Sequence, residues 1–372
     1  QCEYDIKKPG LDRAEQDMNQ LWEATVLAIR KMLEEKPEIR TQIKGIGFSG
    51  QMHGLVMLDA ENQPIRKSII WCDQRTAKEV AEITDKVGAD RMIEITANPA
   101  ITGFTAAKIM WVKNNEPENY ERCRHILLPK DYIRFVLTHE YATEVSDASG
   151  MQLLNIAQRD WSDEVIDGLG LDKTMLGKVY ESCEVTGRLT KRMAELTGLC
   201  EGTPVVGGAG DNAAAAVGTG VVEDGKAFTT IGTSGVVFAH TSKMLTDKLG
   251  RVHTCCAAVP GCWHVMGVTQ GAGLSLKWFR DNFCNAEKET AKLMDVDAYY
   301  LMDKETDTVP IGANRLLYLP YLMGERTPHL DPDARGVFFG LSAMHTKKDM
   351  LRAVMEGVSY SLRDCVEVFK QM

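Results

Sequence analysis

The stretch Val205-Val206-Gly207-Gly208-Ala209-Gly210-Asp211-Asn212 passes from an apolar pair through four small residues to a carboxylate. Four alanines follow at 213–216, so this part of the chain predicts a strand, a glycine-rich bend and the start of a helix. Glycines let a backbone pass close to a ligand, and the first turn of a helix presents N–H donors. The pattern is therefore typical of a ligand-binding turn between a strand and a helix.

Asp211 stands at the end of this turn, and two interpretations of it remain open. Aspartate is a preferred N-cap, so the carboxylate could serve only to cap the helix that follows. A carboxylate in the same place could also accept a proton from a bound hydroxyl group. The run of glycines before Asp211 costs folding entropy and is the reason to consider the second interpretation.

Strands and helices alternate on both sides of this turn. Toward the N-terminus, the sequence predicts a helix through Trp22, Val26, Ile29 and Leu33 with Asp17 as cap and Pro37 as stop, a buried strand at 43–48, strands at 55–58 and 68–71, helices at 75–96 and 105–116, and a loop at 142–155. Toward the C-terminus, it predicts strands at 228–231 and 236–238 and helices at 272–283 and 347–370. This alternation predicts an α/β fold, with the glycine-rich segment 217–226 as the hinge between two domains.

Composition excludes several classes of protein. The 372 residues are 44% hydrophobic and 26% charged, which is ordinary for a globular chain, and they carry a net charge of −9. We expect neither nucleic acid nor a membrane as partner, because the chain lacks a basic surplus and a long apolar run. Its ten cysteines are scattered without a CxxC pair, which favours reduced thiols and a cytoplasmic location.

Three further motifs combine glycine with polar side chains. Gly232-Thr233-Ser234-Gly235 is either a tight hairpin turn or a loop that holds a phosphate, and it is not a Walker A loop. Gly50-Gln51-Met52-His53-Gly54 offers an amide and an imidazole to sugar hydroxyls and a thioether as an apolar floor, although a lone histidine is more often structural. No second histidine lies near it to support a zinc site. We expect Gly324-Glu325-Arg326-Thr327-Pro328-His329 to hold loops or domains together by ion pairs, with a contact to substrate as the alternative.

Two longer segments make the chain resemble a known family. Gly103-Phe104-Thr105-Ala106-Ala107-Lys108-Ile109-Met110-Trp111-Val112-Lys113-Asn114-Asn115 is similar to the first signature of the FGGY carbohydrate kinases. Gly336-Val337-Phe338-Phe339-Gly340-Leu341, continued by 349–356, is similar to the second. The resemblance covers nearly the whole chain, and the motifs at 50–54 and 324–329 are most similar to those of xylulose-specific members.

This resemblance implies a fold of two actin/Hsp70-like (RNase H-like) α/β domains flanking a cleft. It implies a sugar-binding domain at 1–222 and a nucleotide-binding domain at 223–372. Members begin with an Asp-x-Gly-Thr turn that helps to hold Mg²⁺, and they carry a Gly-Gly-Gly adenosine motif beyond the last helix. Neither motif occurs in this sequence, so we expect both domains to be incomplete and the chain to be part of a longer one.

The resemblance also implies an activity and roles for single residues. MgATP would phosphorylate the 5-hydroxyl of D-xylulose, with Asp211 as the general base. The implied sugar contacts are Gln51, Met52, His53, Asp211 and Asn212, and the implied ATP contacts are Gly232, Thr233, Ser234 and, more distantly, Trp278. The ligands of Mg²⁺ are not implied for any residue of this chain, and members of the family are often homodimers.

Two alternatives to this activity remain. The first is another FGGY specificity, such as a ribulose, fuculose or gluconate kinase, because a few pocket residues can change the sugar. The second is a non-catalytic sugar-binding sensor. The presence of both Asp211 and the loop at 232–235 argues against a sensor, because a binding module needs no base beside a phosphate loop.

Overall fold

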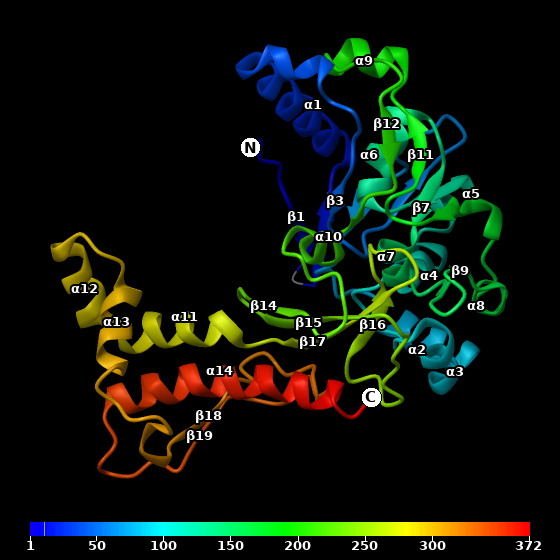
Figure 1. Cartoon of the computed structure of the whole chain (residues 1–372). Coiled ribbons are helices and arrows are strands. Elements are labelled where there is room, and N and C mark those ends of the chain that lie inside the picture. The colour runs from blue at the N-terminus through cyan, green and yellow to red at the C-terminus, as the bar shows by residue number, and fades with distance from the viewer. Residues whose placement is uncertain (11) are drawn as a thin grey trace. The chain divides into compact units, whose positions relative to one another are not determined.

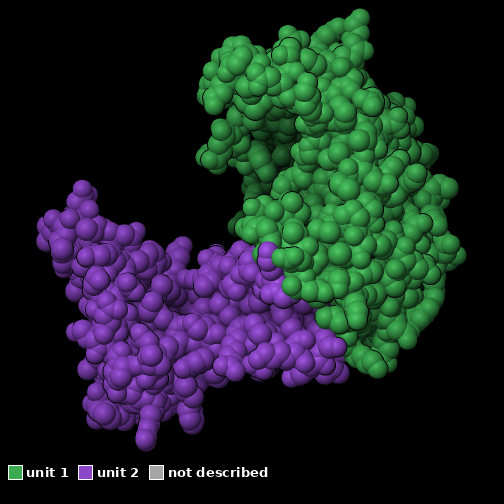
Figure 2. All heavy atoms as spheres, viewed as in Figure 1, with its two compact units in different colours: residues 1–224, 240–248, 254–264 green, residues 225–239, 249–253, 265–372 purple. Residues whose placement is uncertain are grey.

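The computed structural model describes residues 1–10 and 12–372 (Figure 1). It divides into two compact units, coloured separately in Figure 2. Unit 1 comprises residues 1–224, 240–248 and 254–264, and unit 2 comprises residues 225–239, 249–253 and 265–372. Each unit combines helices with short sheets, so the α/β class predicted from the alternating pattern is confirmed.

The first half of unit 1 alternates short strands with helices. In chain order its elements are β1 (Lys7–Gly10), β2 (Arg13–Gln16), α1 (Met18–Glu35), the 3₁₀ helix η1 (Pro37–Thr41), β3 (Ser49–Gly50), β4 (Val56–Leu58), β5 (Ser68–Ile69), α2 (Ala77–Val87), α3 (Ala89–Thr96), α4 (Thr105–Asn115), α5 (Pro117–Arg122), β6 (His125–Leu127) and α6 (Pro129–Thr138). The predicted first helix is confirmed: the Asp17 side chain caps α1 by accepting from the Asn19 N–H, and the helix ends before Pro37.

The second half of unit 1 leads to the glycine-rich turn. Its elements are β7 (Ala142–Glu144), α7 (Val145–Ala148), η2 (Ser149–Met151), β8 (Leu154–Asn155), β9 (Asp160–Trp161), α8 (Asp163–Gly168), η3 (Lys173–Met175), β10 (Lys178–Tyr180), β11 (Val185–Arg188), α9 (Lys191–Thr197), β12 (Pro204–Val206), β13 (Ala209–Gly210) and α10 (Asp211–Gly218). The paired strands are β1-β2-β5, β4-β6, β7-β10, β8-β9, β11-β12 and β3-β13.

Strand β4 explains how unit 1 is packed. Met57 contributes to one buried apolar cluster, whereas Val56 and Leu58 contribute to another. Successive side chains of a strand point to opposite faces, so both faces of β4 are covered by apolar side chains. This is why Leu55–Leu58 reads as a continuous apolar run and not as an alternating one.

Three sequence predictions for unit 1 are wrong in part. The single helix predicted at 75–96 is two helices, because Gly88 adopts a φ of +92° between α2 and α3. The buried strand predicted at 43–48 is only a bridge from Ile46 to Val205 before β3, since the glycines at 45 and 47 supply no side chain to bury.

The loop predicted at 142–155 is in fact a buried segment that contains β7, α7, η2 and β8. Its serines and aspartates can be buried because they bond to one another and to the main chain. Glu144, for example, accepts hydrogen bonds from the backbone N–H groups of Ser146 and Asp147.

Unit 2 is built around a long pair of helices. The elements from residue 227 onward are β14 (Ala227–Ile231), β15 (Gly235–Thr241), β16 (His253–Cys256), β17 (Trp263–Thr269), α11 (Ala272–Phe283), α12 (Asn285–Met294), α13 (Ala298–Thr306), η4 (Ala313–Arg315), β18 (Leu317–Leu319), β19 (Val337–Phe339) and α14 (Lys347–Phe369). The sheet order is β14-β15-β17-β16, and β18 pairs with β19. Helices α11 and α14 lie side by side (Figure 1) and enclose a core around Phe279, Leu351 and Val354. The helices predicted at 272–283 and 347–370 are confirmed, the second ending one residue earlier.

No helix among residues 1–10 and 12–372 combines the length and the apolar character that crossing a membrane requires.

Candidate active site

Two short parallel strands bring the glycine-rich turn next to the Gln-Met-His motif. In the pair formed by β3 and β13, Gly50 lies opposite Gly210. Gln51 and Asp211 are the next residues of the two strands. Because parallel strands run in the same direction, both residues leave the sheet at the same edge. The sugar-site residues predicted from the sequence therefore lie together in unit 1, although 160 positions separate the motifs in the chain.

Position 210 requires glycine, because the Met52 side chain lies directly against its backbone. A Cβ atom at Gly210 would lie 2.7 Å from the Cγ of Met52, closer than real side chains approach. The Met52 side chain is 5% exposed, so its thioether packs under the turn that carries Asp211.

Asp211 begins helix α10, and Gly210 occupies the N-cap position. Its Oδ1 accepts hydrogen bonds from the backbone N–H and the side-chain amide of Asn212, at 2.8 and 3.1 Å. Partial desolvation raises the pKa of Asp211 above the ordinary aspartate value, and the bonds from Asn212 oppose this rise. The interpretation of Asp211 as the N-cap residue is therefore wrong, and Asp211 is an exposed residue in the first turn of the helix.

His53 is held in a fixed orientation. Its backbone has a φ of +67°, which is uncommon for a residue other than glycine. The ring stacks on Phe104 with centroids 4.3 Å apart, and Nδ1 lies 3.0 Å from the carbonyl oxygen of Gly150. Since a carbonyl can only accept, Nδ1 carries the proton and Nε2 of the neutral ring is an acceptor. Gln51, the neighbour of Met52, donates a hydrogen bond to Gln16.

A buried cluster of one lysine and three carboxylates packs against β3 and β13. The Nζ of Lys130 lies 2.8 Å from Asp131, 3.3 Å from Glu144 and 3.4 Å from Asp147. Burial lowers the pKa of Lys130, but the three carboxylates outweigh it and raise that pKa above its usual value. Burial also raises the pKa of Asp147.

This cluster contacts the site at two points. A Cβ atom at Gly50 would lie 2.5 Å from the Cβ of Lys130, so β3 rests directly on the lysine. The Ser146 hydroxyl donates to Glu144 and accepts from the Gly210 N–H at 3.1 Å. In the sequence, this cluster is visible as no more than charged residues between apolar ones, and it was not predicted.

The predicted phosphate loop forms part of unit 2. Residues 232–234 are the exposed turn between β14 and β15, as the hairpin interpretation requires, and Gly235 is the buried first residue of β15. The start of α11 is bonded to this turn: the Gly273 N–H donates to the Gly232 carbonyl at 2.8 Å, and the Leu274 N–H donates to the Thr233 carbonyl at 3.1 Å. A Cβ atom at Gly273 would lie 2.3 Å from the Gly232 oxygen, so only glycine permits this approach.

Trp278 lies on α11, the helix that anchors the turn. It follows Gly273 by five positions, which is about 7.5 Å along a helix. Its ring contacts Phe283 edge-on, with centroids 5.3 Å apart, and it is half-buried against the core of unit 2. Gly232, Thr233, Ser234 and Trp278 therefore belong to one connected substructure.

Glu325 fixes the segment that leads into α11. Its buried carboxylate accepts from the Thr269 hydroxyl at 2.6 Å, the Gln270 N–H at 2.9 Å and the Arg326 N–H at 2.7 Å. Within the part of the chain that the structure describes, neither Glu325 nor Arg326 forms an ion pair. The ion-pair role predicted for residues 324–329 is therefore wrong, because hydroxyl and backbone donors satisfy the carboxylate instead.

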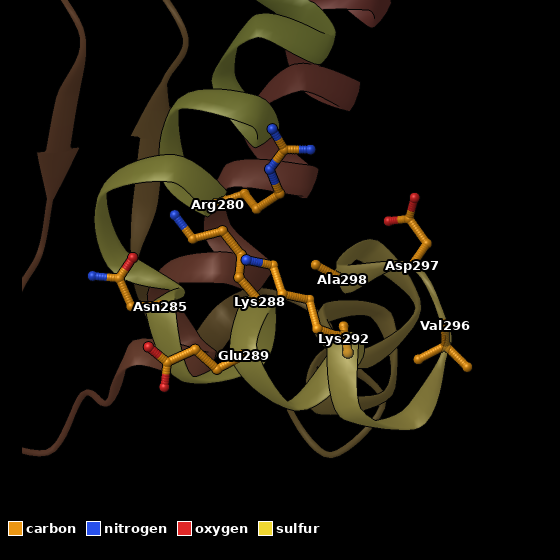
Figure 3. Close-up of a pocket in the computed structure, with 9 residues that line it drawn as sticks. Arg280, Asn285, Lys288, Glu289, Lys292, Val296, Asp297 and Ala298 are labelled. Carbon is orange, nitrogen blue, oxygen red and sulfur yellow. The ribbon is translucent and has the colours of Figure 1, made fainter.

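A pocket of about 520 Å³ lies elsewhere in unit 2, among α11, α12 and α13 (Figure 3). Its wall includes Arg280, Lys288 and Lys292 together with the carboxylates of Glu289 and Asp297. No residue predicted to bind sugar or phosphate lines it. The residues predicted to bind sugar and phosphate therefore lie outside this pocket.

No group of three or more histidine, cysteine, aspartate or glutamate side chains is arranged to hold a metal ion among residues 1–10 and 12–372. Magnesium in phosphoryl-transfer sites typically takes one or two carboxylates and completes its shell with phosphate oxygens and water. Asp211, with its exposed carboxylate, is compatible with one such contact.

Comparison with known proteins identifies the family. Residues 1–218 match the N-terminal domain, and residues 227–372 the C-terminal domain, of the FGGY family of carbohydrate kinases. The xylulose kinase of Bacillus subtilis (strain 168) is 39% identical over 99% of this chain and 72% of its own length. The gluconokinase of Bacillus licheniformis is 31% identical over 96% of this chain and 69% of its own length.

A solved structure gives the same result. The xylulose kinase of Rhodospirillum rubrum superposes with a TM-score of 0.92 at 27% identity, covering 99% of this chain and 73% of that one. The prediction of two actin-like α/β domains is thereby confirmed. Both domain models, the sequence identity and the common fold agree: the chain belongs to the FGGY family of carbohydrate kinases.

Proposed function

We propose that the protein transfers the γ-phosphoryl group of ATP to the 5-hydroxyl of D-xylulose, giving D-xylulose 5-phosphate and ADP. The observation that carries this proposal is the parallel pairing of β3 with β13, which joins the Gln51-Met52-His53 motif to Asp211. The similarity to xylulose kinases supports the choice of sugar. In this proposal residues 1–222 bind the sugar and residues 223–372 bind the nucleotide.

Asp211 is the general base in the proposed reaction. Its carboxylate accepts the proton of the 5-hydroxyl as that oxygen attacks the γ-phosphorus. The transition state of phosphoryl transfer has little bond formation to the attacking oxygen, so most of the rate comes from alignment and charge stabilisation. A base then contributes on the order of 10²- to 10⁴-fold.

The other motifs orient the two substrates. Met52 forms an apolar floor for the sugar carbons, while Gln51, His53 and Asn212 bond its hydroxyls. Gly232, Thr233 and Ser234 offer N–H and hydroxyl donors to the phosphates of ATP, and Trp278 lies toward the nucleotide. Mg²⁺, bound with ATP, would neutralise charge on the transferred phosphoryl group.

A second candidate is a kinase for another sugar of this class, and gluconate has a specific observation in its favour. The gluconokinase of Bacillus licheniformis is 31% identical to this chain over 96% of its length. The xylulose kinase of Bacillus subtilis (strain 168) has the higher identity, 39% over 99% of this chain, and this supports the ketose as the first choice.

The test is ATP consumption by the purified protein with D-xylulose, D-ribulose, L-fuculose and D-gluconate, followed by nuclear magnetic resonance of the phosphorylated product. We expect the highest kcat/KM with D-xylulose and phosphate on carbon 5. A higher kcat/KM with gluconate or another sugar would overturn the proposed specificity. Sugar binding without any ATP-dependent product would favour a sensor over a kinase.

A further inference from the structure

Lys108 is a buried lysine whose amine donates to two main-chain carbonyls. It lies on α4 with no exposed surface, and its Nζ donates to the carbonyl oxygens of His53 and Gly103, both at 2.7 Å. No carboxylate lies within ion-pair distance of Lys108 in the described residues. Buried lysines ordinarily pair with an acid, so this arrangement calls for another explanation.

The two carbonyls match what a neutral amine can offer. Burial lowers the pKa of Lys108 to about 7, while the charge of Asp73 raises it and that of Arg75 lowers it. A neutral amine carries two N–H groups, and two acceptors are present. Lys108 is therefore suited to act through directed hydrogen bonds, whichever protonation state it occupies.

Both carbonyls belong to the residues that orient the imidazole. One is the carbonyl of His53 itself, whose backbone stands at a φ of +67°. The other is that of Gly103, directly before Phe104, on which the His53 ring stacks. The Lys108 amine thus connects the backbone of His53 to the backbone directly before Phe104, the residue on which the imidazole stacks.

We propose that Lys108 is a positioning residue of the sugar site, which holds the His53 imidazole and the adjoining Met52 in the orientation that binds the sugar. This inference rests on the proposed function, because it takes residues 51–53 as the sugar contacts. It adds a residue from the first FGGY signature segment to the binding machinery without requiring that residue to touch the substrate.

The primary test compares D-xylulose affinity, measured by calorimetry without nucleotide, in wild type and Lys108→Met. Methionine keeps the length and the buried apolar stem but removes both donors. We expect the Kd for D-xylulose to rise by about tenfold to a hundredfold. The affinity for a non-hydrolysable ATP analogue should stay within about twofold, because the bonds of Lys108 lie within unit 1.

Lys113→Met is the matched control. Lys113 lies on the same helix, and its Nζ also donates to main-chain carbonyls, those of Gly170 at 2.7 Å and Leu169 at 3.4 Å. These carbonyls belong to another loop, so this variant should bind D-xylulose like wild type. An equal loss of affinity in both variants would show a general effect on α4 and overturn the proposal.

A double variant separates positioning from simple loss of stability. Asparagine tolerates the left-handed backbone of residue 53 but lacks the ring. If Lys108 acts through the imidazole, Lys108→Met should cost little further affinity in a His53→Asn background. An undiminished loss there would refute the proposed route, as would wild-type affinity in Lys108→Met.

Phe104→Leu provides a second route if Lys108→Met does not fold. It removes the stacking partner and leaves the amine in place, and we expect it to weaken D-xylulose binding several-fold. Unchanged binding would contradict the role assigned to the imidazole orientation.

Wild-type protein that binds another sugar of the panel but not D-xylulose would refute only the proposed specificity. The same variants would then be tested with that sugar. Failure to bind any of them would overturn both proposals.

Discussion

Asn212 influences the ionisation of Asp211, and this makes the proposed base accessible to a pH experiment. A general base must be ionised, so kcat/KM should fall on acidification with the pKa of Asp211, which desolvation has raised. Asn212→Ala removes the side-chain hydrogen bond that lowers this pKa, so the acidic limb should move to higher pH. The measurement is the pH profile of kcat/KM for both proteins. A limb that stays in place, or moves to lower pH, would contradict the assignment.

His264, in β17, makes stability depend on pH. Burial lowers its pKa from 6.5 to about 3, so the folded protein keeps the ring neutral where the unfolded chain protonates it. The stability it contributes is complete above pH 6.5 and is lost as the pH falls toward 3. One such group costs about 1.4 kcal/mol per pH unit, or about 2 kcal/mol between pH 7 and pH 5.

Urea unfolding of wild type and His264→Gln at pH 7 and pH 5 tests this prediction. Acidification should destabilise wild type by about 2 kcal/mol more than the variant, whatever the variant's own stability at pH 7. Equal pH dependence in the two proteins would mean that the histidine does not titrate between the folded and unfolded states.

Among single residues, the sequence predicts as site candidates those that stand next to glycines. Asp211, Met52 and His53 could be predicted as site residues because glycines flank them. Glycine destabilises a regular helix or strand, so a run of glycines indicates another role. The partners of Lys108, Lys130 and Glu325 could not be predicted, since they include residues 55, 14 and 56 positions away in the chain. A charged residue in an apolar segment is visible in a sequence, but its buried partners are not.

Helix α11 illustrates what could be predicted at the scale of elements. The bounds of α11 can be predicted from the helical spacing of its apolar residues and from the glycine before it. Both signals are local, because the apolar face of the helix itself packs into the core. The segments at 43–48 and 142–155 could not be predicted in the same way. The first depends on pairing with residues 204–210, and the second buries polar side chains that satisfy one another. Tertiary partners, and not local preference, determine both segments.

The junction between α11 and the turn at 232–235 gives a prediction at the same scale. In Gly273→Ala, the new methyl group would lie 2.3 Å from the Gly232 oxygen and would displace the turn. We expect the KM for ATP to rise at least several-fold, with the Kd for D-xylulose unchanged. Steady-state kinetics and calorimetry provide the two numbers.

Gly168→Ala is the control for this substitution. A Cβ atom built at Gly168, at the end of α8, would lie 3.7 Å from a methyl carbon of Val87, an ordinary van der Waals contact, so this variant should have wild-type kinetics. An unaltered KM for ATP in Gly273→Ala would show that the turn does not depend on its contact with α11.

At the level of the whole molecule, the proposed sugar contacts and the proposed ATP contacts belong to different units. The sugar motifs lie in unit 1, and the phosphate turn with Trp278 lies in unit 2. Amide hydrogen exchange should therefore separate the two ligands. D-xylulose should slow exchange first at residues 49–54 and 209–213, and a non-hydrolysable ATP analogue at residues 232–235 and 273–274. Protection by D-xylulose confined to unit 2 would contradict this division.

The most direct test of the account is Asp211→Asn, a change of one oxygen to an amide nitrogen at the start of α10. We expect kcat with D-xylulose to fall by at least about 10²-fold, as loss of a general base requires. The Kd for D-xylulose, measured by calorimetry without nucleotide, should stay within a few-fold of wild type. A variant that keeps near-normal turnover would show that Asp211 is not the base, and loss of sugar binding would show that it serves binding instead.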